Sequence, residues 1–289
     1  MAREVPGYLG GYRLQNVVHS SRACQIWQAS DDGNQRLVAI KALRDEFAKV
    51  REHVGGLRWE HTVGRKTVHP RIIEIYAFGI ERAIPYLAME WCPVPNMKQR
   101  ILQGVDKLAP VIPTIIVQAA EGLGYFNDQG YVHRDVKPDN FLVADDGATK
   151  LIDLALAVRI RHGLARLFAV KSKVQGTRSY MSPEQIRGET LDQRADVYSF
   201  GCTVHELVCG KPPFTGTNSN ELLNKHLKAP PPSLETFNRN VTAEFAQLIR
   251  RTLAKDPAAR PTSVGEFLRD FQQCKVFKMV PRPANPAPG

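Results

Sequence analysis

The sequence contains few cysteines and no long apolar run. Its five cysteines are Cys24, Cys92, Cys202, Cys209 and Cys274. This odd number, at spacings that fit no zinc motif, is most simply explained by a reducing compartment. No apolar run reaches the ~18 residues of a membrane-spanning helix, and residues 1–11 lack the apolar core of a signal peptide. We therefore expect a soluble, cytoplasmic chain without a membrane segment.

Acidic residues are also comparatively scarce, since 29 Asp and Glu face 39 Lys and Arg and leave a formal net charge of +10. Such an excess favours acidic or anionic partners. The sequence nevertheless lacks an arginine-rich run with interleaved aromatics, which would indicate a nucleic-acid site. We expect a basic, solvated surface and no specific nucleic-acid partner.

The 289 residues are 43% hydrophobic, enough for the core of one large or two-lobed domain. The first ninety residues alternate like strands, and the turn residues 31–34 before Leu37–Leu43 predict a hairpin. From Val111 onward the apolar period is helical. It runs through Ile112, Ile115, Ile116, Ala119, Leu123 and Phe126. The pattern predicts a small β-rich lobe and then a larger helical lobe, connected near residues 90–95.

One short segment, His133–Asn140, reads HRDVKPDN and is followed thirteen residues later by Asp153. Phosphoryl transfer needs a carboxylate for the proton of the acceptor hydroxyl, a cation for the developing phosphate charge and oxygen ligands for magnesium. Asp135 is the candidate base and Lys137 the candidate cation. Asn140 and Asp153 are the candidate metal ligands.

This segment resembles the catalytic loop of eukaryotic-type protein kinases, and its Lys137 resembles the serine/threonine branch. Other segments that resemble the family follow one another in its order along the chain. They are residues 38–41 (VAIK), Glu60, residues 86–90, residues 176–184, residues 196–201 and Arg260. The resemblance spans Tyr12 to Cys274, nearly the whole chain, and the short Gly-Lys-Pro-Pro-Phe segment from Gly210 is most like bacterial members.

The resemblance implies an α+β bilobal fold, with a small β-rich N-lobe that carries one helix, called αC, and a larger, mainly helical C-lobe. We expect an N-terminal extension over residues 1–11 and a kinase domain over residues 12–275. The expected parts of that domain are an N-lobe at 12–89, a hinge at 90–95 and a C-lobe at 96–275. Residues 276–289 are proline-rich and typical of a linker, which leaves room for further domains beyond it.

The resemblance also implies ATP and Mg²⁺ as cofactors, with Mn²⁺ as an alternative metal. Lys41 would contact the α- and β-phosphates and pair with Glu60, and Met89 holds the gatekeeper position. The expected nucleotide contacts are Val18, Ile26, Ala39, Lys41, Met89, Glu90, Cys92 and Leu142.

The chain departs from the family at the loop that should cover the phosphates. His19, Ser21 and Cys24 stand where the family has three glycines. Glycine there lets backbone N–H groups approach the phosphates without a Cβ in the way, so its loss predicts weaker nucleotide binding. The family's Asp-Phe-Gly reads Asp153-Leu154-Ala155, which keeps the metal-binding carboxylate and an apolar anchor.

Glycines also occur in or beside the expected αC helix, at Gly55, Gly56 and Gly64. Each interior glycine costs a helix about 0.5–1 kcal/mol relative to alanine, so we expect a short or loosely held helix. By the resemblance, Gly64 also lacks a large side chain that would pack on Leu154.

The segment after Asp153 carries no further acidic residue until Glu184 and several basic ones. The resemblance makes Arg134 a candidate partner for a phosphate on this segment. We expect Ser172 to be its phosphorylation site, and Thr177 to hydrogen-bond near Asp135 and Lys137.

Four further residues have structural roles by the same resemblance. His133 packs in the core without transferring protons, Glu184 and Arg260 form a buried ion pair, and Asp196 is structural.

These observations predict a protein serine/threonine kinase that acts on other proteins or on itself. Two alternatives stay open. One is a pseudokinase, a regulatory or binding module whose altered loop holds nucleotide weakly or not at all. The other is an enzyme of the same fold with a non-protein acceptor, against which Lys137 and the segment from Gly176 to Glu184 argue.

Overall fold

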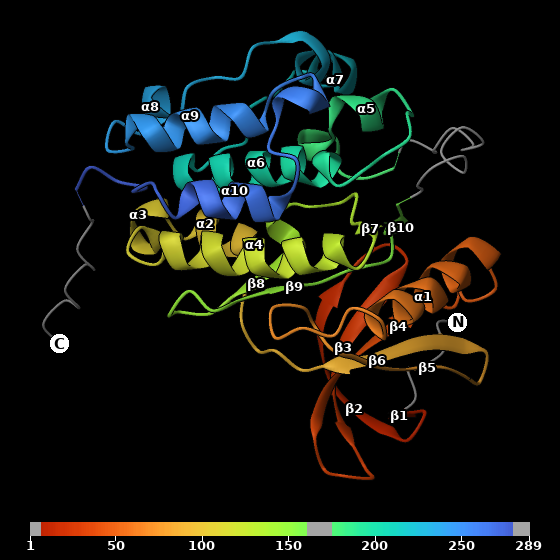
Figure 1. The fold of residues 1–289 in the computed structure, drawn as a ribbon. Helices are drawn as coiled ribbons and strands as arrows, with labels where there is room; N and C mark the ends of the chain where they lie inside the picture. Colours follow the sequence, from red (N-terminus) through yellow and green to blue (C-terminus); the bar gives the residue numbers. More distant parts are fainter. Residues whose placement is uncertain (1–6, 161–174, 280–289) are drawn as a thin grey trace, which may run out of the picture. The chain divides into compact units, whose positions relative to one another are not determined.

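The computed structural model describes residues 7–160 and 175–279, which form two compact units (Figure 1). The first unit consists of residues 1–93 together with 153–155, and the second of 94–152 and 156–289. The division after Pro93 falls inside the predicted hinge at 90–95. The predicted α+β architecture is confirmed, because the first unit is built on a sheet and the second mainly on helices.

The first unit is a six-stranded antiparallel sheet with the strand order β1-β2-β3-β4-β6-β5. Its strands are β1 (Tyr8–Leu9), β2 (Tyr12–Ser20), β3 (Cys24–Asp31), β4 (Leu37–Leu43), β5 (Ile75–Glu81) and β6 (Ile84–Glu90). The predicted hairpin is confirmed, since β3 and β4 pair directly and the turn after Asp31 joins them. Short connections of this kind place neighbouring strands antiparallel.

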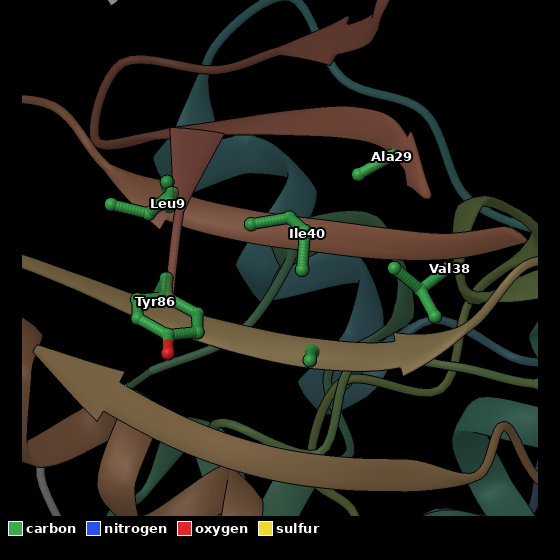
Figure 2. Close-up of a cluster of buried hydrophobic side chains, with 7 residues drawn as sticks. Leu9, Ala29, Val38, Ile40 and Tyr86 are labelled. Atoms are coloured by element: carbon green, nitrogen blue, oxygen red, sulfur yellow. The ribbon is translucent and has the colours of Figure 1, made fainter. Parts of the chain in front are cut away.

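The two faces of β4 have different roles, because side chains alternate along a strand. Val38 and Ile40 point into an apolar cluster with Leu9 and Tyr86, which Figure 2 shows. Lys41 is one residue further along the strand than Ile40, so its side chain lies on the other face of the sheet and can face a polar site. Leu9 is only 1% exposed, so part of the predicted N-terminal extension over residues 1–11 is a strand that seals this cluster.

The helix that corresponds to αC is α1 (Arg51–Gly64), which packs beside β5 and β6. At 14 residues it is not short, so the first of the two expectations, a short helix, was wrong. Gly64 is needed for packing: a Cβ there would lie 2.5 Å from Cδ1 of Ile75. Ile75 fills the space that a larger side chain would take. Around Gly55, by contrast, a Cβ would meet no atom within 4 Å.

These two glycines predict opposite effects of one substitution. Gly55→Ala should raise the free energy of unfolding by about 0.5–1 kcal/mol, because alanine costs less backbone entropy in a helix. Gly64→Ala should lower it by about 1–3 kcal/mol, because Ile75 has to move. Chemical denaturation of both variants checks this pair, and equal shifts for the two would contradict the packing described for Ile75.

The second unit is mainly helical. Its helices are α2 (Met97–Leu102), α3 (Val105–Leu108), α4 (Ile112–Asp128), α5 (Pro183–Ile186), α6 (Arg194–Cys209), α7 (Ser219–Lys228), α8 (Leu234–Phe237), α9 (Ala243–Thr252) and α10 (Val264–Phe271). The predicted apolar face from Ile112 to Phe126 is buried along α4. Helix α6 is buried along nearly its whole length and contacts α4, α9 and α10.

Two small antiparallel pairs complete the second unit: β7 (Tyr131–Val132) with β10 (Val158–Arg159), and β8 (Phe141–Val143) with β9 (Thr149–Leu151). Between β7 and β8 a 3₁₀ turn, η1 (Pro138–Asn140), ends the predicted catalytic segment. Within the described residues, no helix is long and apolar enough to cross a membrane.

The second unit continues past the predicted domain end at residue 275. Val276 and Phe277 are buried at 3% and 6% exposure. The N–H of Lys278 donates to the carbonyl of Asn240 at 2.7 Å, and that of Thr242 donates to Val276 at 3.1 Å. The prediction that a linker begins at residue 276 is therefore corrected, because residues 276–279 pack on the helical unit.

Two buried histidines of the second unit predict acid sensitivity. Burial lowers the pKa of His205 to about 4 and that of His226 to about 3, while an unfolded histidine titrates near 6.5. Between pH 6.5 and 4 the unfolded chain therefore binds more protons. The free energy of unfolding should fall with decreasing pH, by up to about 1.4 kcal/mol per pH unit for each histidine.

The variant His205→Asn isolates one of these groups. The Nδ1–H of His205 donates to the carbonyl of Lys211 at 3.0 Å, and the amide of asparagine can make the same bond without titrating. Denaturation measured from pH 7 to pH 4 should give a flatter pH profile for the variant. An unchanged slope would show that folding does not lower the pKa of His205.

Candidate active site

Three charged side chains meet in the first unit. The ammonium of Lys41, on β4, lies 2.9 Å from Oε2 of Glu60, on α1, and 3.0 Å from Oδ1 of Asp153. Glu60 is buried, whereas the side chain of Asp153 is 41% exposed. The cluster therefore fixes a cation deep in the unit and leaves a carboxylate accessible from solvent.

Lys41 is a permanent positive charge in this arrangement. Burial by itself would lower its pKa, but the carboxylates of Asp153 and Glu60 more than offset burial, so the pKa is raised above its ordinary value. The neighbouring Cys24 is a neutral thiol, because burial raises its pKa despite the attraction of Lys41. Lys41 is thus the group of this cluster that can bind an anion such as a phosphate.

The backbone around Asp153 is held in an uncommon conformation. Asp153 has φ of 63°, in the left-handed region that aspartate tolerates better than most residues. Leu154, which follows it, is fully buried, and its backbone hydrogen-bonds to Glu60. The apolar anchor next to Asp153 is therefore in place although it is a leucine.

The loop without glycines, residues 19–24, is a tight turn that bonds to itself. The N–H of Ser21 donates to the carbonyl of Cys24 at 2.9 Å, and the N–H of Cys24 donates to Oγ of Ser21 at 3.1 Å. No residue of the loop has positive φ, so its shape needs no glycine. Within the described residues, the N–H groups of Arg22 and Ala23 at its tip make no hydrogen bond and are available to an anion.

Four side chains of the predicted catalytic segment and its neighbourhood meet in the second unit. Oδ2 of Asp135 lies 2.6 Å from Nζ of Lys137, and Oδ1 accepts from the N–H and the Oγ1 of Thr177, both at 2.9 Å. Lys137 also donates to Oγ1 of Thr177 at 2.7 Å. The Nδ2 of Asn140 donates to the carbonyl of Asp135 at 2.8 Å, which leaves its amide oxygen for another partner.

A buried carboxylate holds the backbone of this segment in place. Asp196, on α6, is fully buried and accepts from the N–H of His133 at 2.7 Å and from that of Arg134 at 3.0 Å. Arg134 has φ of 71°, which is unusual for a long side chain. The two bonds to Asp196 fix this turn, so Asp135 projects from a rigid loop.

A third donor to Asp196 was not identified from the sequence. Nδ2 of Asn127, on α4, donates to Oδ2 of Asp196 at 2.8 Å and to the carbonyl of Tyr131 at 3.0 Å. Gln185 was missed as well, and its Nε2 donates to the carbonyl of Arg134 at 2.8 Å. Nothing in the local sequence distinguishes these amides from surface ones.

Gly176 is a further residue whose role only the packing reveals. Its φ is +117°, and a Cβ would lie 2.8 Å from the carbonyl oxygen of Arg134. A side chain there would push Thr177 away from Asp135. The remaining predicted regulatory residue, Ser172, lies outside the described residues.

The predicted nucleotide contacts divide between the two units. Val18, Ile26, Ala39, Lys41, Met89, Glu90 and Cys92 belong to the first unit, and Leu142 to the second. Ala39 on β4 pairs directly with Met89 on β6, and both are buried. Val18, by contrast, is 48% exposed.

The ion pair expected between Glu184 and Arg260 is bidentate. Nη1 of Arg260 lies 2.7 Å from Oε1 of Glu184, and Nη2 lies 2.9 Å from Oε2. Arg260 is 1% exposed and also donates to the carbonyls of Arg194 and Ala254. The pair fastens α5, which follows the Thr177 segment, to the helical unit.

The two predicted metal ligands lie one in each unit. Asn140 and Asp153 each offer an oxygen, the kind of ligand that Mg²⁺ prefers. Among the described residues, no group of three or more His, Cys, Asp or Glu side chains could hold a metal.

The fold and these two clusters define a protein kinase domain. The family described as "Protein kinase domain" matches residues 20–275, so the chain belongs to the protein kinase family. The resemblance drawn from the sequence is confirmed.

Curated relatives come from bacteria. The chain is 32% identical over 97% of its length to the serine/threonine-protein kinase PknA of Mycobacterium tuberculosis, of which it covers 65%. It is 30% identical over 94% of its length to the probable serine/threonine-protein kinase SCO3848 of Streptomyces coelicolor, covering 41%. It is 31% identical over 90% of its length to the serine/threonine-protein kinase PknB of Mycolicibacterium smegmatis, of which it covers 42%. The chain thus spans between two fifths and two thirds of these relatives, and it belongs to their eukaryotic-type serine/threonine kinase branch.

Proposed function

We propose that this chain is the catalytic domain of a protein serine/threonine kinase that transfers the γ-phosphoryl group of ATP to hydroxyls of proteins, itself included. The observation that carries the proposal is the cluster of Asp135, Lys137 and Thr177, with one carboxylate oxygen bonded to Lys137 and the other to Thr177. A carboxylate fixed in this way is suited to orient a hydroxyl group.

In the proposed reaction, Asp135 accepts the proton of a serine or threonine hydroxyl as its oxygen attacks the γ-phosphorus. The bond from that phosphorus to the bridging oxygen breaks, and ADP leaves with the electron pair. Lys137, with its ammonium 2.6 Å from Asp135, stabilises the charge of the transferred phosphoryl group. Thr177 holds both groups and prevents the ammonium from rotating away. The contribution of these residues is positioning and charge, which is what phosphoryl transfer requires of a protein.

In the first unit, the cation of Lys41 is proposed to bind the α- and β-phosphates, and Glu60 keeps that cation in place. Asn140 and Asp153 are the residues that would hold Mg²⁺, which shields the phosphate charges when bound. The free N–H groups at the tip of residues 19–24 support nucleotide binding, because a loop without glycines still offers donors there. This observation weighs against the pseudokinase alternative.

Regulation through the segment before Gly176 is part of the proposal. Arg134 is buried, and burial lowers its pKa although Asp196 acts in the opposite direction. A phosphate on Ser172 would supply an anion, which stabilises the positive charge of such a buried guanidinium. We propose the cytoplasm as the compartment, since it supplies ATP and keeps thiols such as Cys24 reduced.

The experiment that tests the function is transfer of the γ-phosphoryl group from ATP, with Mg²⁺, to matched peptides whose acceptor is serine, threonine or tyrosine. We expect labelled serine and threonine peptides, no labelled tyrosine peptide, and no transfer after chelation of the metal. Lys41→Met serves as the control for contaminating kinases. Labelling that persists in this control, or its absence from every peptide and from the chain itself, would contradict the proposal.

A further inference from the structure

The loop of residues 19–24 lies at the surface of the first unit, yet Arg44, the residue that follows β4, holds it in place. The Nε of Arg44 donates to the carbonyl of Ser21 at 2.9 Å, and its Nη2 donates to Oγ of Ser20 at 2.5 Å. The backbone N–H of Arg44 donates to the carbonyl of Ala23 at 2.9 Å. Arg44 therefore bonds to three of the six loop residues.

Arg44 also occupies a junction within the first unit. It follows the end of β4, three residues after Lys41, and its carbonyl accepts from the N–H of Phe47 at 2.9 Å in the turn that leads to α1. The guanidinium of Arg22, at the loop tip, lies 6.0 Å from the ring centroid of Phe47. One residue thus links the loop to the strand of Lys41 and to the connection before the helix of Glu60.

We infer that Arg44 is a positioning residue for nucleotide binding, which fixes the glycine-free loop so that the N–H groups of Arg22 and Ala23 can meet the phosphates. This inference rests on the proposed function. The side chain of Arg22 is turned toward Phe47, and the N–H groups of Ser21 and Cys24 are used inside the turn. Within residues 21–24 the two tip N–H groups are therefore the backbone donors that remain, and their position depends on the bonds from Arg44.

The geometry suits arginine in particular. A guanidinium presents several N–H donors in a planar fork, so Nε and Nη2 can bond to two acceptors at once. A lysine has one nitrogen on a flexible stem and would hold Ser21 or Ser20, at a higher entropic cost. The positive charge of a lysine at position 44 is consequently not enough to fix the loop. Arg44→Lys therefore distinguishes positioning of the loop from simple electrostatic attraction of the phosphates.

The test compares Arg44→Ala and Arg44→Lys with Arg13→Ala in the purified chain. Arg13 is a suitable control because it lies on the same sheet, and its Nε donates to Ser30 at 3.4 Å, near the end of β3 away from the loop. The readouts are the KM for ATP, kcat, the nucleotide-induced shift of the melting temperature and the melting temperature without nucleotide.

For Arg44→Ala we expect about a tenfold higher KM for ATP, corresponding to the loss of two hydrogen bonds, with a much smaller change in kcat. Arg44→Lys should fall between the native chain and Arg44→Ala, and Arg13→Ala should keep the native KM. If Arg44→Ala lowers only the melting temperature and keeps the native KM and nucleotide-induced shift, the inference is overturned while the proposed function stands. If the native chain itself neither binds nucleotide nor transfers phosphate, both fail.

Discussion

Asp135→Asn is expected to reduce kcat for phosphoryl transfer by about 10²–10⁴-fold. Asparagine has the size of aspartate and keeps an oxygen for the two bonds from Thr177, but it cannot take up a proton from a hydroxyl group. Because Asp135 belongs to the second unit and Lys41 to the first, the affinity for nucleotide should stay close to that of the native chain. Steady-state kinetics together with nucleotide titration by thermal shift separate these two quantities.

Asp146→Asn is the matched control for this variant. Asp146 is an exposed turn residue of the same unit, and its Oδ1 accepts from the N–H of Ala148 at 2.8 Å. The same chemical change there should leave kcat unaltered. Should Asp135→Asn retain native kcat, or lose nucleotide affinity in proportion to activity, Asp135 is not the base.

Arg260→Met is expected to lower the free energy of unfolding by about 3–5 kcal/mol, because it leaves the carboxylate of Glu184 buried without its partner. The side chains of this pair are 0% and 6% exposed, so water cannot replace the lost bonds. The loss should appear in chemical denaturation and as a lower yield of folded protein. We expect reduced activity to follow the folded fraction, since Glu184 lies on α5 and contacts no reacting group.

Two further variants make this prediction specific. Arg251 pairs with Glu266 at 2.6 Å and Asp270 at 2.8 Å on the surface, where it is 42% exposed. Arg251→Ala should therefore cost no more than about 1 kcal/mol. The double variant Glu184→Gln with Arg260→Met should recover part of the stability, because it removes the unpaired charge. Equal losses for Arg260→Met and Arg251→Ala would refute the role assigned to burial.

The fold and the clustering of Asp135 with Lys137 could be predicted from the sequence because their signals are local. The alternation along Leu37–Leu43 and the helical period along Ile112–Asp128 determine which faces are buried, and both appear in the structure as strand and helix. The residues His133–Asn140 stand so close together in the chain that their spacing alone brings Asp135 and Lys137 within reach.

Contacts between distant residues could not be predicted in the same way. From the sequence, Gly64 is expected only to destabilise its helix. In the structure, Ile75, eleven residues later, occupies the space where a side chain of residue 64 would lie. The bond of Asn127 to Asp196 joins two helices across 69 positions. Such contacts depend on how the helices and strands pack together. The sequence around either partner gives no sign of them.

The conformation of the glycine-free loop could not be predicted from the sequence either. Because His19, Ser21 and Cys24 replace the family's three glycines, the sequence predicts a loss of contacts between the loop backbone and the phosphates. The turn forms without positive φ and is held by Arg44, whose side chain lies more than twenty positions away. The sequence shows the missing glycines but not the distant arginine that fixes the loop.

The most direct test of the account is the intact mass of the purified chain before and after incubation with ATP and Mg²⁺, beside the Asp135→Asn variant. We predict that the native chain gains phosphate, on serine or threonine residues, and that the variant gains none. A native chain that acquires no phosphate, and transfers none to an added protein although it binds nucleotide, would contradict the assignment of a working kinase.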